Sequence, residues 1–162
     1  MRTMRLTLLP IMVLAALLTL TIEASAFESL EGVWDVHVTI LGACGPSGIP
    51  VNEFPSMITF TRDRKVIEVA GTPLLGPVPV LRLSPGLGTW QHRQGHHSTA
   101  AFTFFRVNVP ANTFAGTQTI TEDIELSQDG NEFTATGTSE VRDTGGNVIL
   151  TGCNTLTGNR ID

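Results

Sequence analysis

The segment that most restricts how this chain can fold is residues 30–40, where apolar and polar side chains alternate, with Val33 the one exception. Alternation with a period of two places Trp34 and Val36 on one face of a β-strand, and Asp35 and His37 on the other. A strand this regular, followed only by further strands and turns, leaves unpaired edges unless the sheet closes on itself. The segment therefore predicts a closed sheet.

The remainder of the chain also reads as strands. After the first 26 residues no helical apolar period is longer than about two turns, and glycine and proline are frequent. Together with residues 30–40, the expected strands are residues 56–62, 66–70, 88–93, 98–107, 116–127, 132–142 and 147–161. We predict an all-β domain that forms a closed antiparallel up-and-down barrel of about eight strands, a size that either fills with side chains or holds one small ligand.

Two hairpin turns fix the expected register. A two-residue turn at residues 129–130 pairs Leu126 with Phe133, and the next turn, by the same rule, pairs Val141 with Val148. The apolar face is then continuous from one strand to the next, which is what a real register requires.

The first and last strands are expected to be neighbours. Pairing them antiparallel brings Arg160 near Trp34 and Cys153 near Cys44. Two cysteines at opposite ends of a secreted domain predict a disulfide. In the chain-entropy model, such a long-range link is worth at most about 4 to 5 kcal/mol.

The first 26 residues have the composition of a secretory signal peptide. Arg2 and Arg5 precede an apolar run of about 17 residues, which is followed by the small residues Ala24 and Ala26. Cleavage after Ala26 leaves residues 27–162 as one barrel domain; an uncleaved membrane anchor is the alternative. We expect a secreted or periplasmic protein that has no membrane association once the signal is removed.

The charge of the mature segment restricts its partners. Removing the signal takes away two arginines and one glutamate, which moves the formal net charge from −5 to −6. The acidic residues are dispersed, which argues against nucleic acid or an anionic membrane as a partner. Nothing in the pattern predicts an oligomeric state.

Residues 71–88 are the least regular part of the chain. They include four prolines, so any strand among them must be short, bulged or at an edge. A long irregular segment in a compact domain is often functional, and a lid over the barrel mouth is one interpretation.

The start of the first strand and the end of the last carry a resemblance to a known family. Gly32-Val33-Trp34 resembles the Gly-x-Trp of the calycin superfamily, the group of lipocalins, fatty-acid-binding proteins and avidins. Arg160 resembles the basic residue of the last strand that packs across that tryptophan. The resemblance implies a lipocalin-like barrel that binds a small hydrophobic molecule.

Glu122 is the main candidate for chemistry, because it lies between Ile120 and Ile124 on the face assigned to the interior. A carboxylate in an apolar lumen is driven toward protonation unless it meets a cation or a donor. We expect Arg106, or else Arg82, to be the charge partner. A structural ion pair, or a side chain at the barrel rim, is the alternative.

Five aromatic residues are candidates to line a ligand: Trp34, Trp90, Phe102, Phe104 and Phe133. Aromatic side chains at alternating positions also form ordinary core, and that alternative stays open. The side to which Trp90 points depends on whether the turn that follows has two or three residues.

The histidines around residues 92–97 suggest a second kind of site. A two-residue turn would pair His92 with His97, as in half of a zinc site, but a third ligand is missing. We therefore predict no metal site, and the chain has no phosphate loop, dinucleotide fingerprint or other cofactor motif.

These patterns lead to two hypotheses for function. The first is a secreted barrel that binds a small apolar ligand in its lumen through one polar anchor. The alternative is a cofactor-free isomerase or cyclase that acts on an apolar substrate inside the barrel, with Glu122 transferring a proton.

Overall fold

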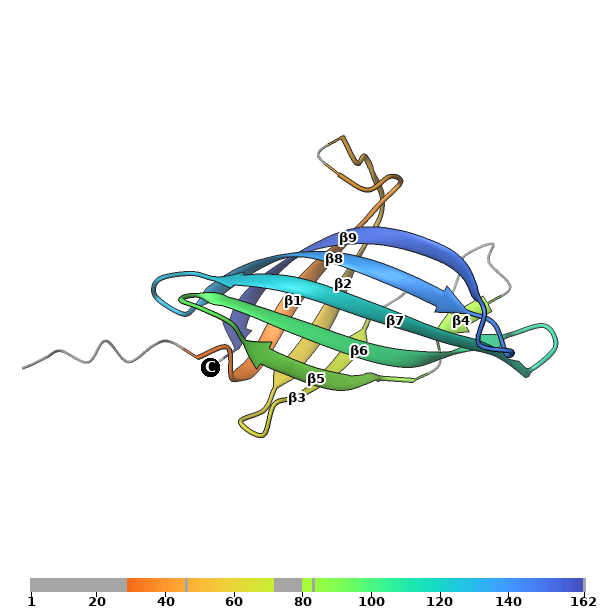
Figure 1. Cartoon of the computed structure of the whole chain (residues 1–162), viewed down its shortest axis with the longest axis horizontal. Coiled ribbons are helices and arrows are strands. Elements are labelled where there is room, and N and C mark those ends of the chain that lie inside the picture. Colours follow the sequence, from red (N-terminus) through yellow and green to blue (C-terminus); the bar gives the residue numbers. More distant parts are fainter. Residues whose placement is uncertain (1–28, 46, 72–79, 83, 162) are drawn as a thin grey trace, which may run out of the picture.

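The computed structural model describes residues 29–45, 47–71, 80–82 and 84–161, and every regular element in these ranges is a β-strand (Figure 1). In chain order the strands are β1 (Gly32–Leu41), β2 (Pro50–Phe60), β3 (Lys65–Ala70), β4 (Val80–Arg82), β5 (Gly86–His92), β6 (His97–Asn108), β7 (Thr113–Leu126), β8 (Glu132–Arg142) and β9 (Val148–Ile161). The predicted signal peptide, residues 1–26, lies outside the described residues. Within them, no helix has the length and apolar character needed to cross a membrane.

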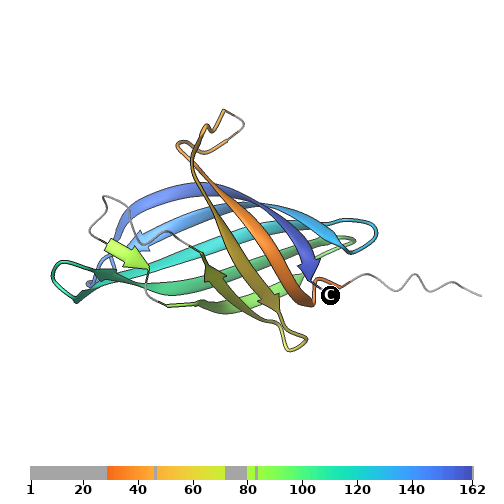
Figure 2. The same ribbon diagram turned by 180° about the vertical axis from the view of Figure 1, so that it is seen from behind.

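The strands close into a barrel, which Figures 1 and 2 show from two sides. The ring runs β1-β2-β3-β5-β6-β7-β8-β9, every pairing is antiparallel, and β9 returns to pair with β1. Among the described strands, the short β4 pairs with β6 alone, next to the part of β6 that β5 does not reach. The prediction of an all-β, closed, eight-stranded antiparallel up-and-down barrel is confirmed.

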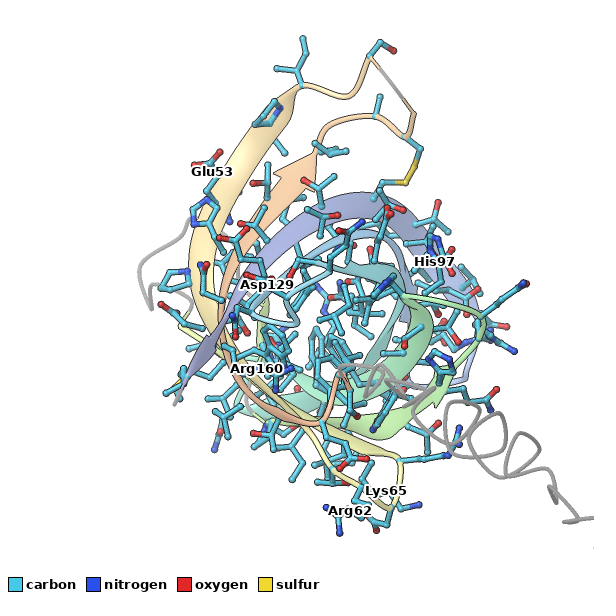
Figure 3. All side chains as sticks on the ribbon, turned by 90° about the vertical axis from the view of Figure 1, so that its left-hand side faces the viewer. Glu53, Arg62, Lys65, His97, Asp129 and Arg160 are labelled. Carbon is cyan, nitrogen blue, oxygen red and sulfur yellow. A yellow bond between two sulfur atoms is a disulfide. The ribbon has the colours of Figure 1, made fainter. Side chains whose placement is uncertain are left out.

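The junction between β1 and β9 has the predicted neighbours. Trp34 lies opposite Arg160, and Leu41 lies opposite Cys153. Cys44 and Cys153 form a disulfide across 109 positions of sequence, visible as the yellow bond in Figure 3. The bond ties the loop that follows β1 to the middle of β9.

The two hairpin registers had different outcomes. Leu126 lies opposite Phe133, as predicted from a two-residue turn. The register of β8 and β9 was predicted wrongly, because Val141 lies opposite Leu150 and not Val148. A shift of two residues keeps the same side chains inside, so the fold is unaffected.

The cause of that shift lies in the β8–β9 turn. The Asp143 carboxylate accepts hydrogen bonds from the backbone N–H groups of Gly145 and Asn147, at 2.9 and 2.8 Å. The Asp143 N–H donates to the Asn147 carbonyl, which makes the loop three residues long. A bulge between Val141 and Arg142 adds the rest of the shift.

Strand β2 begins earlier than predicted, at Pro50 instead of residue 56. Only Ser56 to Phe60 pair with β3, so among the described strands the first part of β2 has a partner on one side alone. Proline is tolerated at such an edge, because its missing N–H removes no ladder hydrogen bond there. Pro50 and Pro55 are therefore part of β2, which extends the strand beyond the expected residues 56–62.

Residues 71–88, predicted to be irregular, include β4 and the start of β5. Residues 72–79 and 83 lie outside the described residues, and the interpretation of this segment as a lid falls mostly on them. Arg82 of β4 lies opposite Arg106 of β6, and Gly86 of β5 lies opposite Glu68 of β3.

One end of the barrel is filled by aromatic side chains. Figure 3 looks into this end, which carries the turns labelled by Lys65 and Asp129. Trp34 meets the Phe133 ring edge to face at 4.9 Å, and Phe60 meets Trp90 and Phe133 in the same way at 6.0 and 6.3 Å. We call this cluster the closed half; its buried members are Leu30, Trp34, Phe60, Val66, Trp90, Leu126 and Phe133.

Arg160 lies on the same face as Trp34 and covers the closed half at the end of the barrel. Its guanidinium lies 4.4 Å from the centre of the Trp34 ring. Its N–H groups donate to the carbonyls of Ser29, Glu31 and Gly130 at 2.7, 2.6 and 2.8 Å. The charge is therefore satisfied by backbone oxygens and by the face of the ring.

Candidate functional site

The other half of the barrel contains a cavity of about 70 Å³, measured as the space that the centre of a water molecule can occupy. The lining is mainly apolar. We call it the cavity half, and it consists of Val38, Ile40, Phe54, Ile58, Glu68, Arg82, Phe102, Phe104, Gln118, Ile120, Glu122, Asn154 and Leu156.

Glu122 reaches into this cavity across a glycine. It lies on β7 opposite Gly137 of β8, which in turn lies opposite Asn154 of β9. The Asn154 amide Nδ2 donates to Glu122 Oε1 at 2.6 Å. A Cβ atom at Gly137 would overlap the Glu122 carboxylate, so the glycine provides the space through which Glu122 reaches Asn154.

Each of these two side chains has one polar atom in the hydrogen bond and one without a partner in the described part of the chain. Glu122 Oε2 and Asn154 Oδ1 accept no hydrogen bond from any residue that the structure describes. Both residues are buried, with exposed fractions of 2% and 5%. An unsatisfied buried polar atom costs about 1–3 kcal/mol, and these two are the only buried polar side-chain atoms without a partner among the described residues.

The surroundings of Glu122 favour its protonated form. Burial raises the pKa of Glu122 to about 8, and the negative charges of Glu68 and Asp123 act in the same direction. The hydrogen bond from Asn154 lowers the pKa and offsets part of this effect. Near neutral pH the carboxyl group can therefore hold or release a proton in response to a modest change in its surroundings.

Glu68 is a second buried carboxylate, and its partners are complete. Ser56 Oγ donates to Glu68 Oε1 at 2.7 Å, and Arg82 forms an ion pair with Oε2. The same guanidinium donates to the Glu68 backbone carbonyl at 3.1 Å and lies 4.0 Å from the centre of the Phe104 ring. Like Glu122, Glu68 lies opposite a glycine, Gly86.

Arg106 does not meet Glu122. Strand β6 places Ala100 opposite Glu122, so Arg106 lies six residues further along, which is about 20 Å at about 3.4 Å per residue. It is half-buried, burial lowers its pKa, and it forms no ion pair with a described residue. Arg82, the second candidate from the sequence, is the arginine that lines the cavity, and its partner is Glu68.

The five candidate aromatic residues divide between the two halves. Phe102 and Phe104 line the cavity, whereas Trp34, Trp90 and Phe133 belong to the closed half. The indole N–H groups of the two tryptophans donate to the backbone carbonyls of Leu30 and Thr61, at 3.0 and 2.9 Å. These three rings are therefore core, which was the alternative that the sequence left open.

The β5–β6 turn has three residues, and this length determines where Trp90 points and which residue pairs with His92. Trp90 lies opposite Ala100 and points inward, while His92 lies opposite Ser98 instead of His97. The pairing on which the zinc hypothesis depended is absent. Among the described residues, no three histidine, cysteine, aspartate or glutamate side chains gather as a metal site would require.

Sequence reasoning missed three polar residues of the site: Glu68, Gln118 and Asn154. Glu68 carried a signal, because it lies between Val66 and Ala70 on the inward side of a short strand. Asn154 carried a weaker one, since it shares the interior face of the last strand with Leu156. Only the strand pairing brings either of them near Glu122.

Chemically, the cavity offers an apolar wall, one neutralised ion pair and one carboxyl group with a free oxygen. It can enclose a small molecule, exclude water from it, and exchange a hydrogen bond or a proton with it. Comparisons with known proteins add no assignment: no protein-family model matches the chain, and neither does any curated protein.

Proposed function

We propose that this protein is a secreted barrel that binds a small, largely apolar molecule in its cavity, with Glu122 and Asn154 as the polar anchor. The observation that carries the proposal is the pair of unpartnered buried polar atoms, Glu122 Oε2 and Asn154 Oδ1, at the wall of an apolar cavity. A bound molecule that forms hydrogen bonds with them would recover the free energy that they cost.

The contrast with Glu68 supports a binding role. A carboxylate kept only for structure would be expected to have complete partners, as Glu68 has in Ser56 and Arg82. Secretion is supported by the signal-like residues 1–26 and by the disulfide, which suits an oxidising compartment. Membership of the calycin superfamily is part of the proposal, supported by the contact of Arg160 with Trp34.

Toluene is a suitable first probe, because it is small and apolar. We expect it to raise the melting temperature of the wild-type protein by a few degrees at saturating concentration. Ile120→Phe, which fills the cavity from its wall, should abolish the shift. Ile149→Phe changes an exposed residue of β9 in the same way and should keep it. No shift in the wild type, and no small molecule in extracts of the protein, would refute the proposal.

A second candidate function is a cofactor-free isomerase or cyclase, and the pKa of Glu122 favours it. A group that titrates at about 8 can both donate and accept a proton near neutral pH. Arg106, the expected charge partner, and Trp90, one of the aromatic residues expected to line the ligand, are not among the residues that line the cavity. The enzyme hypothesis therefore depends on Glu122 alone.

Replacing Glu122 separates the two functions. The small molecules that co-purify with the protein would be identified by mass spectrometry and incubated with the wild type and with Glu122→Gln. An enzyme should lose turnover in the variant while it still binds the molecule. No turnover in the wild type would leave the binding function alone.

A further inference from the structure

The unpartnered atoms restrict the chemistry of the ligand. The Asn154 amide already uses an N–H group on Glu122 Oε1, so its free oxygen can only accept. Glu122 Oε2 also accepts whenever the carboxyl group is ionised. The two atoms belong to neighbouring side chains at one point of the cavity wall, so a ligand group with several N–H donors could satisfy both.

The charged groups around the cavity indicate which sign of charge the ligand should carry. The lining carries three charged groups, and Glu68 and Arg82 neutralise each other, which leaves Glu122 without a counter-charge. The residues opposite Glu122 on β6 and β8 are Ala100 and Gly137, which carry no charge.

Charged groups further from Glu122 also favour a positively charged ligand. Besides burial, two carboxylates raise the pKa of Glu122: Glu68 inside the barrel and Asp123 on its outer face. Arg82 offsets part of the charge of Glu68. Both carboxylates favour positive charge at the position of Glu122, whether it arrives as a proton or as part of a ligand. Arg106 lies about 20 Å along β6, too far for a direct contact.

We infer that the ligand is a small organic cation: a primary ammonium group on an apolar body, with N–H groups that donate to Glu122 Oε2 and Asn154 Oδ1. This inference rests on the proposed binding function and adds the ligand class to it. The apolar body would lie against Phe54, Phe102 and Phe104. Arg82, already paired with Glu68, would keep the second carboxylate from competing for the ammonium group.

The coupling of binding to a proton distinguishes a cation from a neutral ligand. An ammonium group requires ionised Glu122, whose pKa in the unliganded protein is about 8. Binding near pH 6.5 should therefore release about one proton, and affinity should rise about tenfold per pH unit until the pH passes the pKa. A hydroxyl ligand would leave Glu122 protonated, and its affinity would not change over this range.

Three matched probes test this: benzylamine, benzyl alcohol and toluene, which share a ring and differ in the attached group. Isothermal titration calorimetry at about pH 6.5, in buffers of different ionisation enthalpy, measures affinity and proton release together. We expect benzylamine to bind the wild type at least about tenfold more tightly than the other two, with release of about one proton.

Two variants complete the test. Glu122→Gln keeps the shape of the side chain and should remove both the preference for benzylamine and the proton release, while toluene still binds. Asp123→Asn removes a neighbouring negative charge outside the cavity and should keep both. Equal binding of benzyl alcohol without proton release would refute the cation and leave the proposed function intact. Failure of all three probes to bind the wild type would refute both.

Discussion

In both the closed half and the cavity half of this barrel, a glycine on one strand lies opposite a large side chain on the next, but the surroundings that result are different. In the closed half, Gly158 of β9 lies under the Phe133 ring, and the aromatic side chain fills the space that the glycine leaves. In the cavity half, Gly137 lies under the carboxylate of Glu122, and Gly86 lies against both the Phe102 ring and the carboxylate of Glu68. A glycine opposite a large side chain therefore produces dense packing or a polar cavity, depending on the partner.

The difference divides stability from function along the barrel axis. Rings in contact and indole groups satisfied by backbone carbonyls make the closed half a source of stability. The cavity half contains unfilled space and two unpartnered acceptors, both of which lower stability. A stable half beside a less stable half is expected in a protein that keeps a cavity open for a ligand, because the open cavity itself lowers stability.

The largest expected effect is the pH dependence caused by Glu122. Its pKa is about 8 in the folded protein, against an ordinary value of 4.5, so the folded state holds a proton that the unfolded chain releases. This contribution to stability is complete below about pH 4.5 and is lost as the pH rises through about 8. The loss is of the order of 5 kcal/mol, at about 1.4 kcal/mol per pH unit.

Urea unfolding of the wild type and Glu122→Gln at several pH values measures this loss. The difference between the two should grow between pH 4.5 and 8 in favour of the variant, because glutamine does not ionise. Asp123→Asn should follow the wild type. Parallel curves for wild type and Glu122→Gln would show that the cavity carboxylate does not titrate as proposed.

A matched pair of phenylalanine substitutions compares the packing of the two halves. Phe133→Ala should cost about 4 kcal/mol, because its ring touches Trp34 and Phe60 and is almost completely buried. Phe104 already borders empty space and so loses fewer contacts, and Phe104→Ala should cost about 3 kcal/mol, the low end for this substitution. Denaturant midpoints measure both. Equal costs would remove the distinction between a filled half and an open one.

The smallest expected effects come from a matched pair of glycines. Gly158→Ala sets a methyl group against the Phe133 ring, and overpacking of this kind costs about 1–3 kcal/mol. Gly137→Ala displaces the end of the Glu122 side chain and its hydrogen bond with Asn154, for about 1 kcal/mol. Only Gly137→Ala should also weaken benzylamine binding, as calorimetry would reveal. A loss of binding in Gly158→Ala alone would reverse the assignment of the two halves.

Most of the fold could be predicted because alternation and turn chemistry are local. The pairing of Leu126 with Phe133 followed from a two-residue turn, and the pairing of Trp34 with Arg160 followed from closure of the sheet. The register of β8 and β9 was missed because the Asp143 side chain lengthens its turn and a bulge shifts the strand. Neither feature has a periodic signal in sequence.

The site was predicted less well, for a physical reason. Alternation shows which face of a strand a residue occupies, which was enough to place Glu122 inside. The height of a residue along the barrel axis depends on every register around the ring. Arg106 and Glu122 share the interior side but are about 20 Å apart along the strands, and Trp90 lies in the closed half.

The pairing of β1 with β9 means that the order of strands along the chain can be changed without changing the barrel. Val33 lies opposite Ile161, so a short linker could join the two strand ends, and new termini could be opened in the β8–β9 turn. In such a circular permutant the disulfide would close a loop of about 25 residues in place of the present 109-residue separation, which lowers its entropic contribution by about 1 kcal/mol. The cavity, formed only by strand pairing, would be retained.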